Sequence, residues 1–295
     1  FTQTSMVRKL SLDSRKEIFL VFSSTLKKVR RSVISFCRTL WIISMLKVRI
    51  IPLLLLKGAS LVKSVGFTDH RIVGDAVSAI KVFSQRFADE IVILDLDAAE
   101  RGTVNHNLLS RISEFCNMPV AFGGGVNTLE KADILFRSGA DKIVVNSAFF
   151  TDLDVVRAII NKYGSQSIIL SIDVELENGD YCVYYNNGNT KLLDKGLIET
   201  VELAEQVGVG EILVNDISRD GMMNGFDLEL LQKARSLVSL PLIIAGGCAS
   251  KEDFKNAFNL GVDAVSAGSI YHWVGESIIG IKNFLGEHNI NVRKI

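Results

Sequence analysis

Runs of glycine and small polar residues follow four of the apolar segments, and their chemistry suits phosphate. Glycine lets backbone N–H groups approach an anion closely, and the N-terminus of a following helix adds a favourable dipole. Two runs fall within residues 123–147 and two within 246–269, so the pattern predicts a ligand with a phosphate at each end. The alternative is that these glycines only close tight turns. The predicted phosphate ligands are Gly124, Gly125, Asn146, Ser147, Gly246, Gly247, Gly268 and Ser269.

A carboxylate beside such phosphates could transfer protons, and Asp173 is the best candidate. It ends the apolar segment 167–173, and a carboxylic acid is an effective general acid or base when its surroundings bring its pKa close to neutrality. A loop-capping role is the alternative. Asp95 and Asp216 also end apolar segments, and for these two residues we predict structural hydrogen bonds to backbone N–H groups.

Four charged residues stand at the opposite ends of the apolar segments, at or near the first residue of each. Two are basic and two are acidic, so they could pair into a ring that closes one end of a barrel. Ordinary surface charge is the alternative. The four residues are Arg49, Glu90, Lys142 and Glu211.

The elements that must position these residues are duplicated in the sequence. Residues 240–272 align without a gap on residues 118–150, and their glycines and serines coincide. Each copy has the pattern of a strand, a glycine turn, a helix and a second strand. Repetition at this period predicts a (βα)8 barrel of the TIM type with a twofold half-barrel repeat, divided at about 45–165 and 166–295.

Short runs of Val, Ile and Leu alternate with segments of helical periodicity from Met45 onward. The runs are almost continuously apolar, as expected for parallel strands buried on both faces. Helical periodicity is clear in 75–86 and 197–207. An open, doubly wound sheet is the alternative, but it would not explain the repeat. The predicted strands are 47–54, 91–96, 119–122, 142–146, 167–173, 211–215, 241–245 and 263–267.

Two connections between the predicted elements are longer than the others. Residues 55–73 contain Gly58, Lys63 and Gly66, and we predict a mobile loop over the barrel mouth. Residues 177–193 alternate aromatic and apolar side chains with polar ones before an Asn-Asn-Gly turn. This second pattern predicts a small hairpin inserted after the fifth strand.

Composition limits the class of protein and its location. Basic and acidic residues are equal in number, 33 each, so the charge gives no indication of a nucleic-acid partner. The four cysteines have neither a CxxC spacing nor a disulfide pattern, which indicates a reducing, cytoplasmic location. The histidines lack metal-ligand spacing, and we predict no metal and no cofactor.

Residues 1–44 differ from the rest, because they hold nine basic and two acidic residues. Their apolar runs are far shorter than the roughly 20 residues of a membrane span, so no span is predicted. A basic amphipathic or targeting segment is the alternative. We favour an upstream extension that is poorly ordered or foreign to the natural protein. The barrel domain is therefore predicted to be 45–295.

A set of short motifs in residues 45–293 supports a family assignment. They are RIIP at 49–52, FGGGV at 122–126, GADK at 139–142, NSA at 146–148, YGSQ at 163–166, RDG at 219–221 and HNINVR at 288–293. With these motifs the chain resembles the cyclase subunit of imidazole glycerol phosphate synthase, the HisF type. The resemblance implies a glutaminase of the HisH type docked on the N-terminal face of the barrel, with ammonia passing along the axis to a bisphosphorylated substrate.

The same resemblance implies roles for individual residues. Asp173 would be a catalytic acid–base, with Lys63 and Asp220 on the substrate side, and Asp141 would contact the partner. The four charged residues at the strand starts would form the ammonia gate, and the glycine pairs would hold the phosphates.

The chain departs from the family pattern at the catalytic end. Leu55 stands where the first strand of the family ends in an aspartate needed for cyclisation, Asn215 and Asp216 replace a small hydroxyl pair, and Ala245 precedes Gly246. Loss of one of two acid–base groups typically costs a factor of about 100 to 10,000 in rate. The pattern resembles the branch associated with sugar amidation in surface-polysaccharide synthesis.

Three other functions remain open at this point. The chain could be a cyclase of the histidine pathway that uses another residue. It could be a non-catalytic scaffold that conducts ammonia from a glutaminase to a separate enzyme. An Amadori isomerase of the related barrel family is disfavoured by the segment 163–166 and by the C-terminal motif.

Overall fold

The computed structural model describes residues 47–66 and 70–294. The predicted extension 1–44 and Met45 therefore lie outside the described residues. Within them, no helix is long and apolar enough to cross a lipid bilayer.

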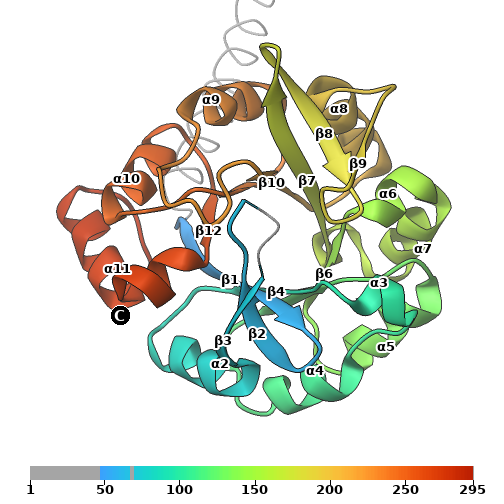
Figure 1. Cartoon of the computed structure of the whole chain (residues 1–295), viewed down its shortest axis with the longest axis horizontal. Helices are drawn as coiled ribbons and strands as arrows, with labels where there is room; N and C mark the ends of the chain where they lie inside the picture. The colour runs from blue at the N-terminus through green and yellow to red at the C-terminus, as the bar shows by residue number, and fades with distance from the viewer. Residues whose placement is uncertain (1–46, 67–69, 295) are drawn as a thin grey trace, which may run out of the picture. The chain divides into compact units, whose positions relative to one another are not determined.

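Eight parallel strands close into a barrel, which Figure 1 shows with the helices arranged around it. The pairing runs in chain order and closes where the eighth barrel strand pairs with the first. All eight predicted strands are confirmed, with ends that differ by a few residues. They are β1 (Arg49–Lys57), β4 (Ile91–Asp95), β5 (Val120–Gly123), β6 (Lys142–Val145), β7 (Ile168–Glu177), β10 (Glu211–Asp216), β11 (Leu242–Ala245) and β12 (Ala264–Ala267).

The strands are apolar on both faces because each face packs against a different layer. One buried cluster fills the barrel interior, with Ile51, Val92, Ile169, Leu213 and Ile243 among its members. A larger cluster lies between the strands and the surrounding helices. Burial of both faces explains why the sequence shows continuous apolar runs in place of alternation.

Helices follow the strands and are fixed by local capping. The side chain of Asp75 accepts a hydrogen bond from the backbone N–H of Ser78 at the start of α2, and Val77, Ile80 and Phe83 form the buried face of that helix. The helices are α2 (Ala76–Gln85), α3 (Ala98–Arg101), α4 (His106–Ser113), α5 (Leu129–Arg137), α6 (Ser147–Thr151), α7 (Leu153–Tyr163), α8 (Leu197–Val207), α9 (Leu228–Leu237), α10 (Lys251–Asn259) and α11 (Ile278–Glu287), with a 3-10 turn η1 (Ser165–Ser167) and a π-helical turn η2 (Ile270–Val274).

The connection over 55–73, predicted as a mobile loop, contains regular strands that were not predicted from the sequence. Strand β1 continues to Lys57 and pairs antiparallel with β2 (Ser60–Lys63), which pairs in turn with β3 (Arg71–Asp75). Gly58, with φ of +62°, makes the tight turn between β1 and β2, and Leu56 faces Leu61 across the pair. Local pairing of apolar residues therefore turns most of this connection into a ribbon.

The second long connection is a hairpin, as predicted. Strand β7 extends past the barrel and pairs with β8 (Asp180–Tyr185), which pairs with β9 (Thr190–Lys191). Asn178 and Gly179 both have positive φ at the turn, which suits the right-handed twist of a hairpin. Its other end reaches the barrel mouth through Asn186 and Asn187.

Candidate active site

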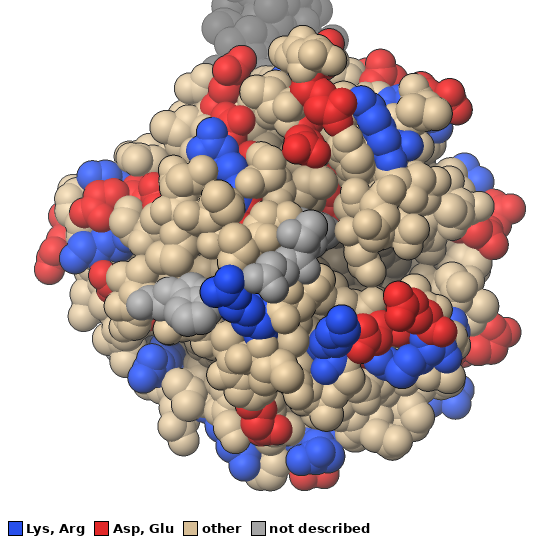
Figure 2. Space-filling model, in the orientation of Figure 1, with Lys and Arg blue, Asp and Glu red and all other residues tan. Residues whose placement is uncertain are grey.

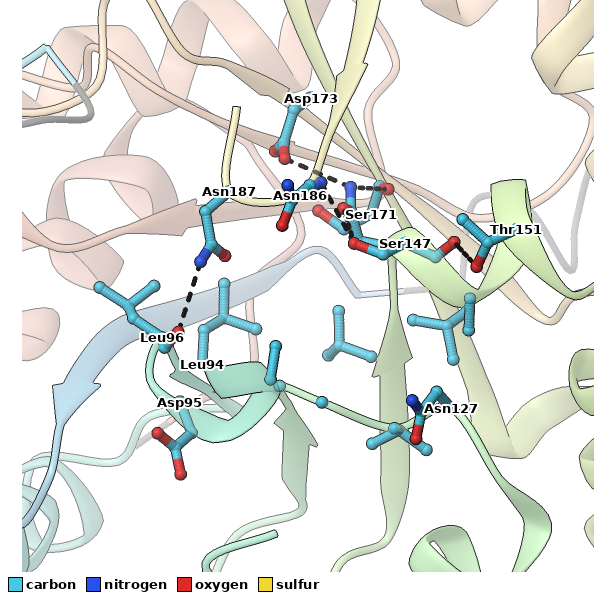
Figure 3. Close-up of a pocket in the computed structure, with 18 of the residues that line it drawn as sticks. Leu94, Asp95, Leu96, Asn127, Ser147, Thr151, Ser171, Asp173, Asn186 and Asn187 are labelled. Carbon is cyan, nitrogen blue, oxygen red and sulfur yellow. Dashed lines mark hydrogen bonds between the residues drawn. The ribbon is translucent and has the colours of Figure 1, made fainter. Parts of the chain in front are cut away.

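A cavity of about 230 Å³ opens at the carboxyl ends of the strands and collects the first group of predicted residues (Figure 3). It is formed mainly by the ends of β4, β5, β6, β7 and β10. Its polar lining includes Gly124, Gly125, Asn146, Ser147, Ser171, Asp173, Asn186, Asn187 and Asn215. The structure therefore brings together four predicted phosphate ligands and the predicted acid–base.

The glycines of this group are required by close backbone contacts. A Cβ atom added at Gly124, where φ is +117°, would lie 2.2 Å from the carbonyl oxygen of Asp95. The equivalent residue in the second repeat, Gly246, has φ of +92° and stands in the same relation to Asp216, at 2.3 Å. Both glycines are therefore required by tight turns against neighbouring backbone, and phosphate binding by either of them remains a prediction.

Gly124→Ala is expected to reduce the free energy of unfolding by about 1–3 kcal/mol because the added methyl overlaps the Asp95 backbone. The same change is expected to weaken binding of inorganic phosphate, measured by calorimetry. Gly102→Ala is the matched control, since Gly102 also has positive φ, +68°, but has open space around it. Equal effects of the two substitutions would show that backbone strain alone is responsible.

The second set of predicted phosphate-binding residues also lies together, but the cavity that these residues line is small. Gly246, Gly247, Gly268 and Ser269 line a space of only about 10 Å³ together with Asp220. The amine of Lys63 rests against Gly268, where an added Cβ atom would lie 1.8 Å from Nζ. Lys63 thus occupies space beside Gly268, and binding of a phosphate by this second set remains a prediction.

Lys63 and Asp220 lie close to this second group, as the sequence predicted. Lys63 is buried and donates a hydrogen bond to the carbonyl oxygen of Leu53 at 3.0 Å. Burial lowers the pKa of Lys63 to about 8, while the nearby Asp220 opposes that shift. Asp220 accepts a hydrogen bond from the hydroxyl of Ser64, so the β2–β3 ribbon is tied to the loop after β10.

Asp173 is buried at the base of the first cavity between two asparagine amides. Its two oxygens accept hydrogen bonds from Asn215 Nδ2 at 3.1 Å and from Asn146 Nδ2 at 3.2 Å. Burial raises the pKa of Asp173 to about 7, with a further contribution from Asp220, and the two amide hydrogen bonds limit the rise. A carboxyl group with this pKa can exchange protons at neutral pH.

The other carboxylates near the mouth are structural. Asp216 accepts hydrogen bonds from the backbone N–H groups of Ser218 and Arg219, at 3.1 and 3.3 Å, as predicted. Asp95 also accepts a backbone hydrogen bond, from Asp97, and in addition pairs with the guanidinium of Arg101, 2.5 Å away, which was not predicted from the sequence. Leu55 lines the same cavity as Asp173, so the position expected to hold a second acid is apolar.

The four charged residues at the strand starts form a closed ring of ion pairs. Arg49 lies 2.7 Å from Glu90 and 2.6 Å from Glu211, and Lys142 lies 2.8 Å from Glu90 and 2.6 Å from Glu211. Each cation therefore contacts both anions, which rules out ordinary surface charge. The ring covers the end of the barrel interior opposite to Asp173, and its role as a gate remains a prediction.

Glu90→Ala is expected to lower the free energy of unfolding by about 3–5 kcal/mol, because it leaves two cations facing each other beside a single anion. The Glu90 side chain is only 2% exposed, so water cannot replace it. Urea unfolding would measure the loss. Asp154→Ala, which breaks an exposed pair with Arg157, is the control and should change stability little; comparable losses in the two variants would contradict the prediction.

Asp141 lies at the same end of the barrel as the ring. Its side chain accepts a hydrogen bond from the backbone N–H of Val120 at 2.9 Å, and Asp263 does the same for Leu242 at 2.8 Å in the second repeat. The residue is exposed, so it has a structural role that leaves it accessible, and contact with a partner remains a prediction.

Several residues at the mouth were not identified from the sequence. The backbone N–H of Asn186 donates to the hydroxyl of Ser147 at 3.1 Å, and Asn187 donates to the carbonyl oxygen of Leu96 at 3.3 Å (Figure 3). The tip of the β8–β9 hairpin thereby contacts Ser147, which belongs to the first set of predicted phosphate-binding residues. The Asn-Asn-Gly turn was visible in the sequence, but nothing local indicated where it would dock.

Charge on the face shown in Figure 2 is mixed, with acidic and basic side chains both present around the rim. No single sign dominates this view, which suits a small ligand better than a nucleic acid.

A closed (βα)8 barrel with glycine turns and a buried carboxylic acid at the carboxyl ends of its strands has the architecture of the (βα)8 barrel enzymes, whose active sites lie at that face. The family model described as "Histidine biosynthesis protein" matches residues 49–274. The chain belongs to this family, in its HisF branch.

Relatives that align with the chain over nearly their whole length support that placement. The chain is 38% identical to the Campylobacter jejuni "Putative imidazole glycerol phosphate synthase subunit hisF2", over 84% of this chain and 99% of that protein. It is 36% identical to the imidazole glycerol phosphate synthase subunit HisF of Exiguobacterium sibiricum, over 84% of this chain and 100% of that protein. The corresponding Pyrobaculum aerophilum subunit is 38% identical, over 83% of this chain and 98% of that protein.

Proposed function

We propose that this barrel receives ammonia at its ion-pair ring from a glutaminase of the HisH type and presents it at the mouth to a phosphorylated small molecule. The observation that carries the proposal is the combination of a complete charged ring at one end with glycine cradles and Asp173 at the other. The interior cluster between the two ends is apolar, and a neutral molecule such as ammonia crosses such a layer more readily than an ion does.

The chemistry at the mouth follows from the pKa of Asp173. When ammonia forms a bond to an electrophilic carbon, the new nitrogen centre carries an extra proton that must be removed. Asp173, with a pKa of about 7, can accept that proton and return it to a leaving group. The two phosphates of the substrate would be held by the two sets of predicted phosphate-binding residues, one on each side of the barrel mouth.

Leu55 supports a paralogous role in which ammonia serves sugar amidation in surface-polysaccharide synthesis. Leucine cannot transfer a proton, so a reaction that needs two opposed acids is disfavoured in this site. Relatives in Campylobacter jejuni and Pseudomonas aeruginosa carry names that end in hisF2, which is consistent with a paralogue. The free cysteines Cys116, Cys182 and Cys248 agree with the proposed cytoplasmic location.

Two other functions keep specific support. A histidine-pathway cyclase is favoured by Asp173 and by the relatives named as HisF subunits. A non-catalytic scaffold that hands ammonia to a separate enzyme is favoured by Leu55, because the cavity is retained while one acid is missing.

A single-turnover assay with the histidine-pathway intermediate and ammonium chloride tests the proposal. We expect no cyclised product from the wild-type protein, together with binding of a HisH-type glutaminase that Arg49→Ala weakens. Cyclised product from the wild type would identify a histidine-pathway cyclase. Absence of glutaminase binding would refute ammonia delivery.

A further inference from the structure

A second cavity adjoins the cavity that holds Asp173. It has a volume of about 330 Å³ and is lined by residues of the β1–β2 ribbon, of the segment after β4 and of the hairpin tip. A volume of this size lies within the range of small-molecule sites. The two cavities share three lining residues, Leu55, Leu96 and Asn187, and are therefore neighbours. We call the cavity with Asp173 the inner cavity and its neighbour the outer cavity.

The shared wall between the two cavities is weakly held. Nδ2 of Asn187 donates to the carbonyl oxygen of Leu96 at 3.3 Å in an exposed hydrogen bond (Figure 3). An exposed hydrogen bond can be exchanged for bonds to water at little cost. A ligand that offers a donor to Leu96 and an acceptor to Asn187 can therefore replace this bond and extend from one cavity into the other.

The hairpin tip reaches both cavities with its asparagines. Asn186 and Asn187 have positive φ, +56° and +54°, a conformation that asparagine tolerates better than other non-glycine residues. The backbone N–H of Asn186 donates to the hydroxyl of Ser147 in the inner cavity, while Asn187 and Asn189 line the outer cavity. Strained backbone of this kind is concentrated at ligand sites. One turn thus connects the first set of predicted phosphate-binding residues to the outer cavity.

The charges of the outer cavity do not favour a second phosphate. Its lining holds the carboxylates of Asp97 and Glu100 against one ammonium group, Lys57, and one imidazole, His70. Asp97 accepts a hydrogen bond from the backbone N–H of Gly58 at 2.9 Å. Lys57 and Glu100 are exposed, and neither side chain has a hydrogen-bond or ion-pair partner among residues 47–66 and 70–294. This balance of charge suits a neutral ligand that both donates and accepts hydrogen bonds.

The mixed lining fits the ring of a sugar better than other neutral groups. Leu55 and Leu96 supply apolar surface, and the asparagine amides and charged groups supply donors and acceptors beside it. A sugar ring has an apolar C–H face and hydroxyl groups that both donate and accept, so it can use the two kinds of lining together. An alkyl chain would use only the leucines and would remove water from polar groups without replacing its hydrogen bonds.

We infer that the outer cavity binds the sugar ring of a sugar phosphate, whose phosphate is held in the inner cavity by the first set of predicted phosphate-binding residues. This inference rests on the proposed function, in which the barrel binds a phosphorylated small molecule, and it names the class of that molecule. Leu55, which stands where the family has a carboxylate, lines both cavities and supplies apolar surface for the C–H face of the ring.

Calorimetric titration of the full chain tests the inference with probes that need no turnover. The probes are D-ribose 5-phosphate, D-glucose 6-phosphate and N-acetyl-D-glucosamine 6-phosphate, with inorganic phosphate and butyl phosphate for comparison. We expect at least one sugar phosphate to bind about tenfold or more tightly than inorganic phosphate and butyl phosphate, the contribution of one to two hydrogen bonds.

Two exposed side chains of the outer cavity locate this preference. Glu100→Ala and Asn189→Ala should each weaken sugar-phosphate binding about three- to tenfold, the value of one hydrogen bond, and leave binding of inorganic phosphate unchanged. Glu229→Ala is the matched control for Glu100→Ala, because both glutamates lie exposed in the first turn of a helix and Glu229 lines neither cavity. It should change neither affinity.

Nuclear magnetic resonance of the ¹⁵N-labelled protein provides a second readout. The side-chain amide of Asn189, assigned by its loss in Asn189→Ala, should shift when the preferred sugar phosphate binds and stay in place with inorganic phosphate. The backbone spectrum checks that each variant is folded.

The inference is overturned if no sugar phosphate binds more tightly than inorganic phosphate, if butyl phosphate binds as tightly as the best sugar phosphate, or if both cavity variants keep the wild-type affinity. These outcomes differ from failure of the proposed function. Phosphate binding without a preference for sugars would refute the outer cavity alone. A protein that binds none of the five probes would refute the phosphorylated substrate of the proposed function and the inference with it.

Discussion

Leu55→Asp is expected to raise turnover of the histidine-pathway intermediate with ammonium by about 100- to 10,000-fold, the usual contribution of one general acid–base group. Leu55 lines the same cavity as Asp173, so a carboxylate at this position would supply the second proton-transfer group at the mouth. The backbone position is already set, because Leu55 is paired with Leu94 on one side and Val62 on the other. Product formation in single-turnover experiments would measure the gain.

The controls for this substitution separate charge from shape. Leu55→Asn has nearly the same size as aspartate but cannot accept a proton, so it should give no gain. Both variants remove a leucine that is 5% exposed, and a loss of stability of about 2–5 kcal/mol is expected in each. If Leu55→Asp folds and binds phosphate but produces no more cyclised product than Leu55→Asn, the missing acid is not what limits this site.

Asp173→Asn is expected to reduce any ammonium-dependent turnover by about 100- to 10,000-fold, because asparagine holds the same position but cannot exchange a proton. In the Leu55→Asp protein, which supplies measurable turnover, the rate should rise with pH through about 7, where Asp173 becomes ionised and able to act as a base. Addition of Asp173→Asn to that protein should remove the rise. Rates measured between pH 5.5 and 8.5 would show the difference, and a variant that keeps both the rate and the pH profile would exclude Asp173 as the acid–base.

The same substitution is expected to stabilise the protein at alkaline pH. Burial raises the pKa of Asp173 to about 7, above the ordinary value of 3.8. Between these values the folded state binds the proton more tightly than the unfolded state, so stability falls as pH rises through the window. Ionisation of Asp173 above pH 7 therefore costs roughly 4 kcal/mol at most.

Asparagine at position 173 avoids the cost of ionisation. It also leaves the amide of Asn146 or Asn215 without an acceptor, and this loss offsets about 1–3 kcal/mol of the stability gained. We expect Asp173→Asn to gain about 1–3 kcal/mol relative to the wild type at pH 8 and to gain nothing at pH 5. Thermal unfolding at the two pH values would measure this. A variant that shows the same difference from the wild type at both pH values would contradict a raised pKa.

The strands and the positions of the functional residues along them could be predicted from the sequence. Parallel strands buried on both faces must be continuously apolar, and the residues that end them must meet at one face of the barrel. Asp173 and the two glycine groups were located by that rule. The ring of Arg49, Glu90, Lys142 and Glu211 was located by the same rule applied to the strand starts.

The errors arose where pairing beyond neighbouring residues decides the structure. The connection after β1 lacks a regular strand pattern, yet it forms the ribbon with β2 and β3 because Leu56 and Val62 find apolar partners across it. For Asp95 a backbone hydrogen bond was predicted and is present, but the ion pair with Arg101 of the following helix was not predicted. Neither contact follows from residue spacing alone.

By itself, the sequence determined the barrel, its internal repeat, the place of Asp173 at a strand end and the leucine at position 55, because these depend on residue type and position along each strand. Only the tertiary structure decided that the amine of Lys63 lies against Gly268 and that the amides of Asn146 and Asn215 both donate to Asp173. Those features depend on which side chains meet across strands, and that is fixed by the register and closure of the barrel.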